Sequence, residues 1–503
     1  MDRWGDSSWA SGRGSRFGRG LRRGNRRRRH SRLTWEGWLV VLGAVALFAG
    51  AGWTGRAAYR AWSAEDAGAS FEAGLPAVSA APPPAVPRPP IGVLAPPTGR
   101  DRFDASRSFG GSFDPSAPVR LARAIPVGAA SAPPGSSLRI EYTLDERLTH
   151  EVFEILRKGR VDRGHALVID PRSGRLLVYA STDPEGFPGE EAYPAASIVK
   201  VLTTAAMLDA GDEGADTSCV YRGNKYRINR RRLDRPNSGR ESDLTDALAT
   251  SNNQCFSQWA VNVLGEDRLR RTFEHFGWLS APAFGHAPGR IETVENRLDL
   301  GRLGSGLDGL RVTPLHVAAL TTILNDGMLR EPWWIDRVVD GAGRSLPLPP
   351  RTEARRVLES DRAEELRDMM VATTTRGTAK GAFRTRRGKR LRGDLRVAGK
   401  TGNLTGRDPF GRYEWFVGVA PADSPRIGVV VLQLQSNLWW KKSTELGASI
   451  LREVFCERGR CRADLADRWT GDLGREIERL PLSALEEPLR IARRDDESDS
   501  IRR

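Results

Sequence analysis

Three short polar strings hold the residue types that acyl-transfer chemistry needs. They are Ser-Ile-Val-Lys at 197–200, Ser-Asn-Asn at 251–253 and Lys-Thr-Gly at 400–402. Serine is a weak nucleophile until an adjacent base takes its proton, and lysine can serve as that base. Lysine is scarce here, since only eight of the 78 Lys and Arg residues are lysines and two of them fall in these strings. The strings are therefore the first candidates for a catalytic site.

The first string is predicted to begin a buried helix. Pro194 suits the first turn of a helix, and apolar residues flank both Ser197 and Lys200. Residues three apart on a helix share a face, so the two side chains are expected within hydrogen-bonding distance. Burial and the positive potential of a helix N-terminus both lower the pKa of a lysine, which leaves Lys200 a neutral base. An exposed lysine on an ordinary helix is the alternative, and the apolar neighbours argue against it.

The second string allows a structural and a chemical interpretation. Ser251 and Asn253 lie between the predicted helices 244–249 and 256–264. Ser and Asn are common helix caps, and capping is the favoured interpretation when this string is taken alone.

The third string is predicted to end an apolar strand at 395–399. Lys400 and Thr401 offer a cation and a hydroxyl to a carboxylate, and Gly402 leaves room for a substrate backbone to approach. The string therefore indicates a carboxylate-binding strand edge.

The elements that must position these residues follow from apolar periodicity. A helix is predicted from Leu144 to Lys158 with Thr143 as its N-cap, and residues 195–380 are predicted to be mostly helical. The remaining elements are predicted as strands at 165–170, 175–180, 395–399, 414–419 and 427–433, and a helix at 443–455. This order predicts an α/β (α+β) fold, with an antiparallel five-stranded sheet built from both ends of the domain, flanked by helices, plus a helical subdomain.

The N-terminal part of the chain shows no sign of a folded core. Residues 1–34 hold eleven Arg and are expected to be disordered, and the uncharged stretch 37–55 would span about 30 Å as a helix, enough to cross a bilayer. The arginines predict a cytoplasmic N-terminus and place everything after Arg56 outside. A cleaved signal peptide is the alternative to this single anchor. Residues 56–137 are rich in Pro and Ala and are predicted to be a linker, with order beginning near Leu138.

The formal net charge of +15 raises the question of a nucleic-acid partner. Much of the excess lies in the N-terminal arm, and the remaining Arg is interpreted as scattered. Anionic lipid or wall polymer is therefore the expected electrostatic neighbour, and nucleic acid is not. No Cys or His spacing suits a metal site, and neither a metal nor a cofactor is expected.

All four cysteines follow the predicted anchor, on the side of the membrane where disulfides persist. Three connectivities are possible. Cys456 and Cys461 are close in sequence and can close a small loop, and Cys255, beside the second string, can reach Cys219. Free buried thiols are the alternative to both pairings.

The stretch from about Leu138 to Phe455 resembles the transpeptidase domain of penicillin-binding proteins. The three strings match S-x-x-K, S-x-N and K-T-G in the family's order. Further segments that resemble the family are Thr143–Leu148, Val168–Gly174, Gly304–Gly306, Val312–Leu315, Gly377–Ala379 and Trp415–Gly418. The resemblance implies a β-lactamase/transpeptidase-like fold. It also implies a serine-type D-Ala-D-Ala transpeptidase, an acyltransferase that binds penicillin and cross-links peptidoglycan stem peptides.

The resemblance implies a role for each residue of the first two motifs. Ser197 is the acylated nucleophile and Lys200 is its base. Ser251 relays a proton to the leaving group, and Asn253 holds the amide of the substrate.

The resemblance also implies the carboxylate and oxyanion contacts. Lys400 and Thr401 bind the terminal carboxylate of D-Ala-D-Ala or of a β-lactam, and the backbone N–H groups of Ser197 and Asn403 form the oxyanion hole. The chain departs from the family at two positions, because Ala196 stands where Gly is usual and Asn403 where Thr or Ser is usual. The second departure keeps the backbone N–H donor and replaces the side-chain hydroxyl that usually contacts the substrate carboxylate.

Three alternatives share the same motifs. A D,D-carboxypeptidase would use water as the acceptor, a β-lactamase would turn the drug over rapidly, and a sensor or scaffold would be acylated without cross-linking anything. The string Glu295–Asp299 faintly resembles the loop that supplies the deacylation base of class A β-lactamases. A single Glu in a charged loop is usually solvated, so this likeness is discounted.

Resemblance and composition together predict a monofunctional, membrane-anchored plan. Its parts are an Arg-rich cytoplasmic arm at 1–34, a transmembrane anchor at 35–55, a linker at 56–137, the penicillin-binding transpeptidase domain at 138–457 and a charged tail at 458–503. The expected location is the cytoplasmic (inner) membrane, single-pass, with the catalytic domain extracytoplasmic or periplasmic. The expected partners are stem peptides, β-lactams as inhibitors, inner-membrane lipid and other wall-synthesis proteins.

Overall fold

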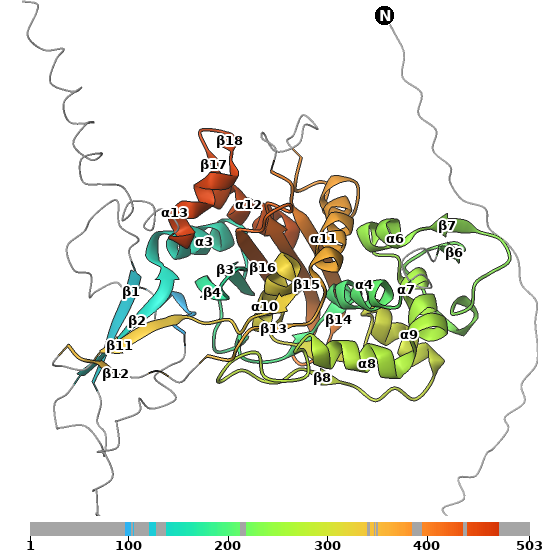
Figure 1. The fold of residues 1–503 in the computed structure, drawn as a ribbon, viewed down its shortest axis with the longest axis horizontal. Helices are drawn as coiled ribbons and strands as arrows, with labels where there is room; N and C mark the ends of the chain where they lie inside the picture. Colours follow the sequence, from blue (N-terminus) through green and yellow to red (C-terminus); the bar gives the residue numbers. More distant parts are fainter. Residues whose placement is uncertain are drawn as a thin grey trace, which may run out of the picture. The chain divides into compact units, whose positions relative to one another are not determined.

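A five-stranded antiparallel sheet forms the centre of the described part of the chain (Figure 1). Its strand order is β14-β15-β16-β3-β4. The strands are β3 (Arg163–Asp170), β4 (Arg175–Ser181), β14 (Ala398–Gly406), β15 (Gly411–Ala420) and β16 (Ile427–Gln435). Val168 of β3 pairs with Val429 of β16, so the early and late parts of the chain meet in the middle of the sheet. The predicted fold class and the assembly of the sheet from both ends are confirmed.

The structure is a computed structural model. It describes residues 96–101, 104, 120–126, 137–211, 218–339, 343–346, 348, 351–384, 395–435 and 440–471. The predicted cytoplasmic arm, the predicted anchor, most of the predicted linker and the tail after residue 471 lie outside these residues. Within the described residues, no helix is long and apolar enough to cross a membrane.

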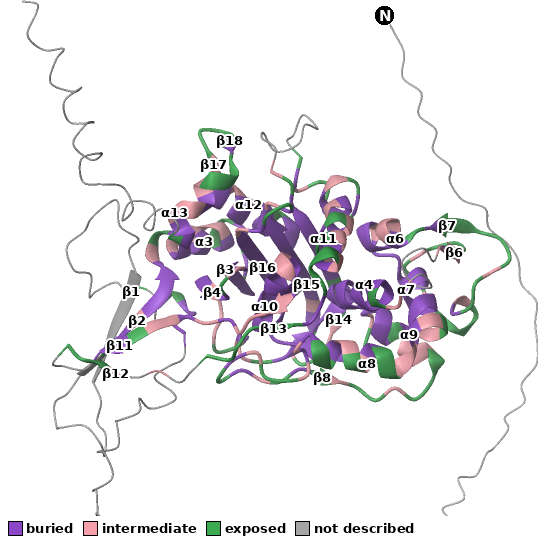
Figure 2. Ribbon diagram, viewed as in Figure 1, coloured by how far each residue is buried: buried purple, intermediate pink, exposed green. Residues whose placement is uncertain are grey.

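Helices cover both faces of the central sheet, and this explains its apolar strands. Every residue of β16 is buried, as expected for a strand with packed neighbours on both sides (Figure 2). Gly447 of α12 (Ser443–Phe455) lies against Phe416 of β15, whereas Thr321 of α10 (Pro314–Asp326) lies against Gly428 of β16. Gly428 pairs with Val419, three residues from Phe416 and hence on the opposite face. The helix α3 (Glu146–Lys158) packs beside α12.

A helical subdomain lies beside the β14 edge of the sheet (Figure 1). Its helices are α4 (Val199–Asp209), α6 (Leu244–Thr250), α7 (Asn253–Trp259), α8 (Gly265–His275), α9 (Arg297–Ser305) and α11 (Ser360–Thr375). Two short strands, β6 (Cys219–Tyr221) and β7 (Arg240–Ser242), pair beside α7. The predicted helical middle is confirmed, and it brings α4, α6 and α7 together around the polar strings.

The start of the ordered chain differs from the prediction. Thr143 lies in the strand β2 (Ser137–Asp145), and Asp145 caps α3 by accepting a hydrogen bond from the Leu148 N–H at 2.8 Å. The missed signal is the period-2 burial of Ile140, Tyr142 and Leu144. A further strand, β1 (Arg120–Pro126), lies inside the stretch predicted to be linker and pairs with β2.

These strands belong to a small second sheet with order β1-β2-β11-β12, completed by β11 (Ile335–Val339) and β12 (Ser345–Leu346). Short elements fill the remaining connections. They are β5 (Tyr193–Pro194), β8 (Arg290–Ile291), β9 (Leu310–Val312), β10 (Met328–Leu329), β13 (Arg355–Arg356), β17 (Cys456–Glu457), β18 (Arg460–Cys461) and α13 (Asp467–Thr470).

Two disulfides are present. They join Cys219 to Cys255 and Cys456 to Cys461, the two pairings that the sequence suggested, and free thiols are therefore the wrong alternative. The first links β6 to α7, and the second closes the β17–β18 hairpin. The Cys219–Cys255 bridge thereby attaches β6 to the helix that begins with Asn253.

Candidate functional site

The serine and lysine of the first string meet at the start of α4. Pro194 belongs to the short strand β5, and a single 3-10 turn, Ala196–Ile198, carries the serine into the helix. The Lys200 Nζ donates a hydrogen bond to Ser197 Oγ at 2.7 Å. Lys200 is fully buried, while Ser197 keeps 9% of its surface exposed. The geometry suits a nucleophile that a substrate can reach and a base that water cannot.

Three further groups set the state of the lysine. The Lys200 Nζ donates to Asn253 Oδ1 at 2.9 Å and to the Ser305 carbonyl oxygen. Burial, and next the cation of Lys400, hold the pKa of Lys200 well below its usual value. No carboxylate appears among its hydrogen-bond partners in the described part of the chain. A neutral amine able to accept the Ser197 proton is the consequence.

In the Ser-Asn-Asn string, one residue caps a helix and the other two contact the lysines. Ser251 ends α6 in the left-handed conformation, with φ 55°, and its hydroxyl accepts from Lys400 Nζ at 3.2 Å. Asn252 caps α7, because its Oδ1 accepts the Gln254 N–H at 3.1 Å. Asn253 contacts Lys200 as described. The capping interpretation is therefore right for the middle residue, and the outer two face the lysines.

The third string lies inside a strand and does not end one, which corrects the prediction. Residues 400–402 belong to β14, and the predicted strand at 395–399 overlaps β14 by only two residues. The Lys400 Nζ also donates to the Thr401 carbonyl oxygen at 2.8 Å. Lys400 is fully buried, and this burial lowers its pKa to about 7. Its charge is therefore poised near neutral pH.

The strand β14 runs close to the serine turn, and Gly402 lies where little space is left for a side chain. A Cβ on Gly402 would lie 3.2 Å from Ile198 Cγ1 and 3.3 Å from Ala196 Cβ. A larger side chain would push the strand away from Ser197. Asn403, the next residue, is exposed. The expected oxyanion donors, the backbone N–H groups of Ser197 and Asn403, thus belong to segments that pack together.

Sequence reasoning assigned no role to two groups at this site. The Thr378 hydroxyl lies 2.7 Å from the Thr401 hydroxyl, so that a second hydroxyl flanks the K-T-G string. The Ser305 carbonyl anchors Lys200 from below. Both positions lie in segments that resemble the family, Gly377–Ala379 and Gly304–Gly306. Their presence in those segments was the available signal.

The backbone at Ala196 explains why glycine is usual at this position. Its φ is 48°, in the left-handed region, where a side chain costs about 1–2 kcal/mol. Gly306, with φ 66°, packs directly beneath, and a Cβ there would lie 2.0 Å from the Ala196 carbonyl oxygen. The turn that presents Ser197 is therefore held in an unfavourable conformation by close backbone packing.

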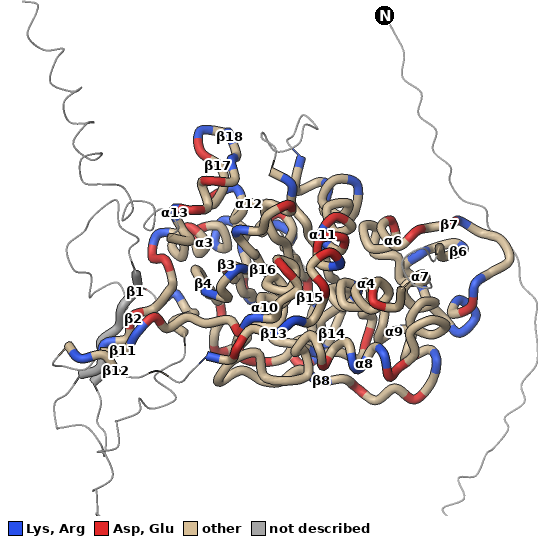
Figure 3. Tube along the Cα trace, in the orientation of Figure 1, with Lys and Arg blue, Asp and Glu red and all other residues tan. Residues whose placement is uncertain are grey.

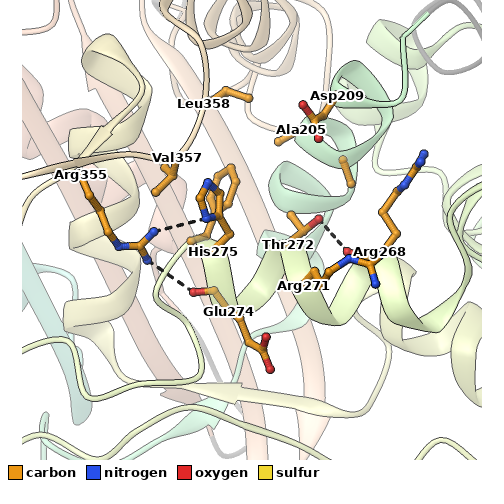
Figure 4. Close-up of a pocket in the computed structure, with 12 residues that line it drawn as sticks. Ala205, Asp209, Arg268, Arg271, Thr272, Glu274, His275, Arg355, Val357 and Leu358 are labelled. Carbon is orange, nitrogen blue, oxygen red and sulfur yellow. Dashed lines mark hydrogen bonds between the residues drawn. The ribbon is translucent and has the colours of Figure 1, made fainter.

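Two other features lie apart from this cluster. Glu295 is exposed, and its neighbour Asn296 caps α9, so the β-lactamase-like string is a helix entry. A cavity of about 610 Å³ lies between α4, α8 and residues 355–358, with Arg268, Arg271 and Arg355 among its lining residues (Figure 4). No residue of the three strings lines it.

Comparison with known proteins agrees with the site. The penicillin binding protein transpeptidase domain family matches residues 164–455. A Mycolicibacterium smegmatis protein named peptidoglycan D,D-transpeptidase PbpA is 27% identical over 263 residues, which cover 48% of this chain and 50% of the relative. Its namesake from Mycobacterium tuberculosis is 26% identical over 336 residues, 58% of this chain and 66% of the relative. The match therefore spans less than two thirds of either relative.

Solved structures agree on the fold. Penicillin-binding protein A from M. tuberculosis, as an imipenem acyl-enzyme complex, superposes with a TM-score of 0.51 and 21% identity over 62% of this chain and 78% of that chain. The family match covers more than half of the 503 residues, and the three motifs converge as side chains in contact. The chain therefore belongs to the penicillin binding protein transpeptidase domain family.

Proposed function

We propose that this chain is a peptidoglycan D,D-transpeptidase that works through an acyl-enzyme on Ser197. The observation that carries the proposal is the position of Lys200 Nζ, 2.7 Å from Ser197 Oγ and 2.9 Å from Asn253 Oδ1 in a fully buried setting. Two relatives bear the name peptidoglycan D,D-transpeptidase, which supports the same reaction here.

Acylation starts with proton transfer from Ser197 Oγ to the neutral amine of Lys200. The oxygen then bonds to the carbonyl carbon of the penultimate D-alanine, and the backbone N–H groups of Ser197 and Asn403 receive the oxyanion. When the intermediate collapses, the peptide bond breaks. Ser251, held by Lys400, relays the proton that Lys200 took from Ser197 to the departing D-alanine amine, so that Lys200 is neutral again.

The second half-reaction returns the serine. An amine of a neighbouring stem peptide attacks the ester carbonyl and gives up a proton to Lys200. The new peptide bond forms as Ser197 Oγ leaves, and the proton returns to that oxygen. Lys200 therefore takes the proton from Ser197 during acylation and returns a proton to Ser197 during acyl transfer.

The substrate carboxylate is proposed to lie against β14 and the adjacent Thr378. Lys400 supplies the charge and Thr401 a hydroxyl. Asn403 carries an amide where relatives of this family usually have a hydroxyl. Because the Thr378 hydroxyl lies 2.7 Å from that of Thr401, it can supply the second hydroxyl in its place.

The test uses the full chain and a fluorescent penicillin. Ser197→Ala should abolish covalent labelling, and Lys200→Ala should slow it by roughly a thousandfold or more, as expected when a nucleophile loses its base. Ser257→Ala is the matched control, because this buried serine of α7 bonds only the Gly301 carbonyl in the described structure. Labelling of the Ser197→Ala protein would contradict the proposal.

A second measurement separates transpeptidation from its alternatives. The protein is incubated with a stem pentapeptide, with and without an acceptor amine, and the products are identified by mass spectrometry. A cross-linked dimer supports the proposal. If the shortened tetrapeptide is the only product, the protein is a carboxypeptidase. Rapid hydrolysis of penicillin indicates a β-lactamase. Acylation without any peptide product indicates a sensor or scaffold.

We also propose the membrane plan that the sequence suggests. Residues 35–55 anchor the chain with residues 1–34 in the cytoplasm, and the domain at 138–457 works outside at the end of the linker. The charge asymmetry around the apolar stretch supports this orientation. Alkaline phosphatase fused after residue 137 should be active, whereas a fusion after residue 34 should not. The reverse pattern would contradict it.

A further inference from the structure

A strongly basic loop lies between β6 and β7. Residues 222–240, here called the basic loop, hold eight Lys and Arg residues and one Asp among 19 positions, against 78 Lys and Arg in the 503 residues of the chain. The interpretation of the Arg beyond the N-terminal arm as scattered is therefore wrong for this segment. Figure 3 shows these cations in blue beside β6, β7 and α7.

The basic loop is anchored directly to the second catalytic motif. The Asn253 Nδ2 donates to the Tyr226 carbonyl oxygen at 2.8 Å, while its Oδ1 receives Lys200. Gln254 donates through its backbone N–H to the Lys225 carbonyl at 3.1 Å and through its Nε2 to the Asn224 carbonyl at 2.7 Å. Tyr226 is therefore linked to Ser197 through only two side chains, those of Asn253 and Lys200.

Several cations of the basic loop have no acidic partner in the described structure. Arg227, Arg230 and Arg231 are exposed and form no ion pair there. The one acid of the loop, Asp234, pairs with Arg297 of α9 at 2.7 Å and so neutralises no cation of the loop. Arg235 reaches Glu241 only at 3.8 Å. Positive charge therefore accumulates at this edge of the site.

The basic loop also offers an aromatic surface. Tyr226 is 50% exposed, and the Lys225 Nζ lies 5.4 Å from the centre of its ring. Like charges held together repel, and an anionic ligand relieves that repulsion. The fixed backbone and the surplus of cations together indicate a recognition surface for an extended anion that approaches the catalytic serine.

We propose that the basic loop binds the carboxylates of the acceptor stem peptide, which is the peptide whose amine attacks the ester on Ser197. This rests on the proposed transpeptidase function. The acceptor must reach the acyl-enzyme from outside, and a stem peptide carries free carboxylates at its C-terminus and on its acidic residues. Lys400 and Thr401 serve the donor's terminal carboxylate on β14, whereas Arg227, Arg230 and Arg231 serve the acceptor beside α7. The hydrogen bond between Asn253 and the Tyr226 carbonyl attaches the loop to the catalytic site. This attachment favours a ligand that reacts at Ser197 over an anionic polymer that does not.

The test measures binding to the penicillin-acylated full chain, so that it does not depend on turnover. A fluorescent acceptor peptide is compared with the same peptide whose carboxylates are converted to amides, by fluorescence anisotropy in 50 mM salt. The wild-type protein should bind the free-carboxylate peptide about tenfold more tightly, as expected for two or three exposed charge contacts. Arg230→Gln/Arg231→Gln should remove this preference, and 0.5 M salt should remove it in the wild type.

The matched control is Arg268→Gln/Arg271→Gln on α8, which removes the same charge from two exposed arginines beside the cavity of Figure 4. It should bind both peptides like the wild type. Equal wild-type affinity for the two peptides overturns the proposal without any variant. So does tighter binding of inorganic polyphosphate that is lost in Arg230→Gln/Arg231→Gln while peptide binding persists. If the peptide preference is found but no dimer forms in turnover, the transpeptidase function fails and the anion site stands.

Discussion

At the scale of single residues, the site is organised around two lysines that are removed from water. A buried ammonium group costs several kcal/mol unless it is paired or loses its proton. Neither Lys200 nor Lys400 has a carboxylate among its described hydrogen-bond partners, and each contacts hydroxyl, amide or carbonyl oxygens instead. Burial lowers both pKa values, and the cation of Lys400 lowers that of Lys200 further. One lysine is thereby suited to act as a base, and the other carries a charge that depends on pH.

The charge of Lys400 predicts how acylation responds to pH. Its pKa is lowered to about 7 by burial, so the cation that attracts the β-lactam carboxylate is lost as pH rises through 7. The second-order rate constant for acylation by penicillin should therefore fall above pH 7. It should also fall at low pH, where Lys200 becomes protonated and cannot act as a base.

Lys400→Arg tests the assignment, since arginine stays protonated throughout this range. The variant should be slower but should lose the decline above pH 7. The exposed Lys158→Arg is the control and should keep the wild-type profile. Retention of the decline in Lys400→Arg would assign it to another group.

At the scale of elements, the motifs were predictable from the sequence, while the backbone that places them was only partly so. Ser197 and Lys200 sit in an apolar segment, and Pro194 together with the apolar residues on both sides predicted the start of a buried helix there. β14 was misplaced because Ala398–Gly406 is rich in Gly and polar residues, and only its pairing with β15 makes it a strand. β1 was missed for the same reason, since its partner β2 defines it. Long-range pairing leaves little local signal.

The Cys219–Cys255 bridge is predicted to support the second motif. It closes a separation of 36 residues and joins β6 to the helix that begins with Asn253. Cys219→Ala/Cys255→Ala should lower the free energy of unfolding by about 3–4 kcal/mol, from the entropy of a loop of that length. Penicillin acylation should also slow, because the amide that contacts Lys200 is held less firmly.

The second bridge gives an internal comparison for this variant. Cys456–Cys461 closes a separation of only five residues, in a hairpin after α12. Cys456→Ala/Cys461→Ala should cost about 2 kcal/mol and leave the acylation rate unchanged. Urea unfolding and stopped-flow labelling measure the two effects. Equal acylation rates in both variants would show that the first bridge does not support the motif.

At the scale of the whole molecule, stability depends on a sheet whose middle strands come from opposite ends of the domain. β3 pairs with both β16 and β4 and packs against α10, and all of its residues except the first are buried. His165 lies on β3, is fully buried and stacks on Phe187 with ring centres 4.9 Å apart. Burial lowers its pKa to about 3. Because this imidazole is held neutral in the core, the stability of the fold depends on pH.

This histidine predicts an acid-sensitive global stability. In the unfolded chain a histidine takes up a proton near pH 6.5, whereas folded His165 resists protonation down to about pH 3. The unfolded state therefore binds more protons in this window, and the free energy of unfolding falls as pH falls, by about 1.4 kcal/mol per pH unit from this group.

His165→Phe keeps the ring packing and should remove that share of the slope. Phe187→Leu, which loses packing but no titrating group, should instead lower stability by a constant amount at every pH. Chemical denaturation from pH 4 to pH 7 measures the free energy of unfolding of the wild type and both variants. The buried carboxylates Asp145 and Glu414 have raised pKa values and change stability with pH in the opposite direction. Their contribution is the same in all three proteins, so it cancels when each variant is compared with the wild type. An unchanged slope in His165→Phe would mean that the ring is not held neutral in the core.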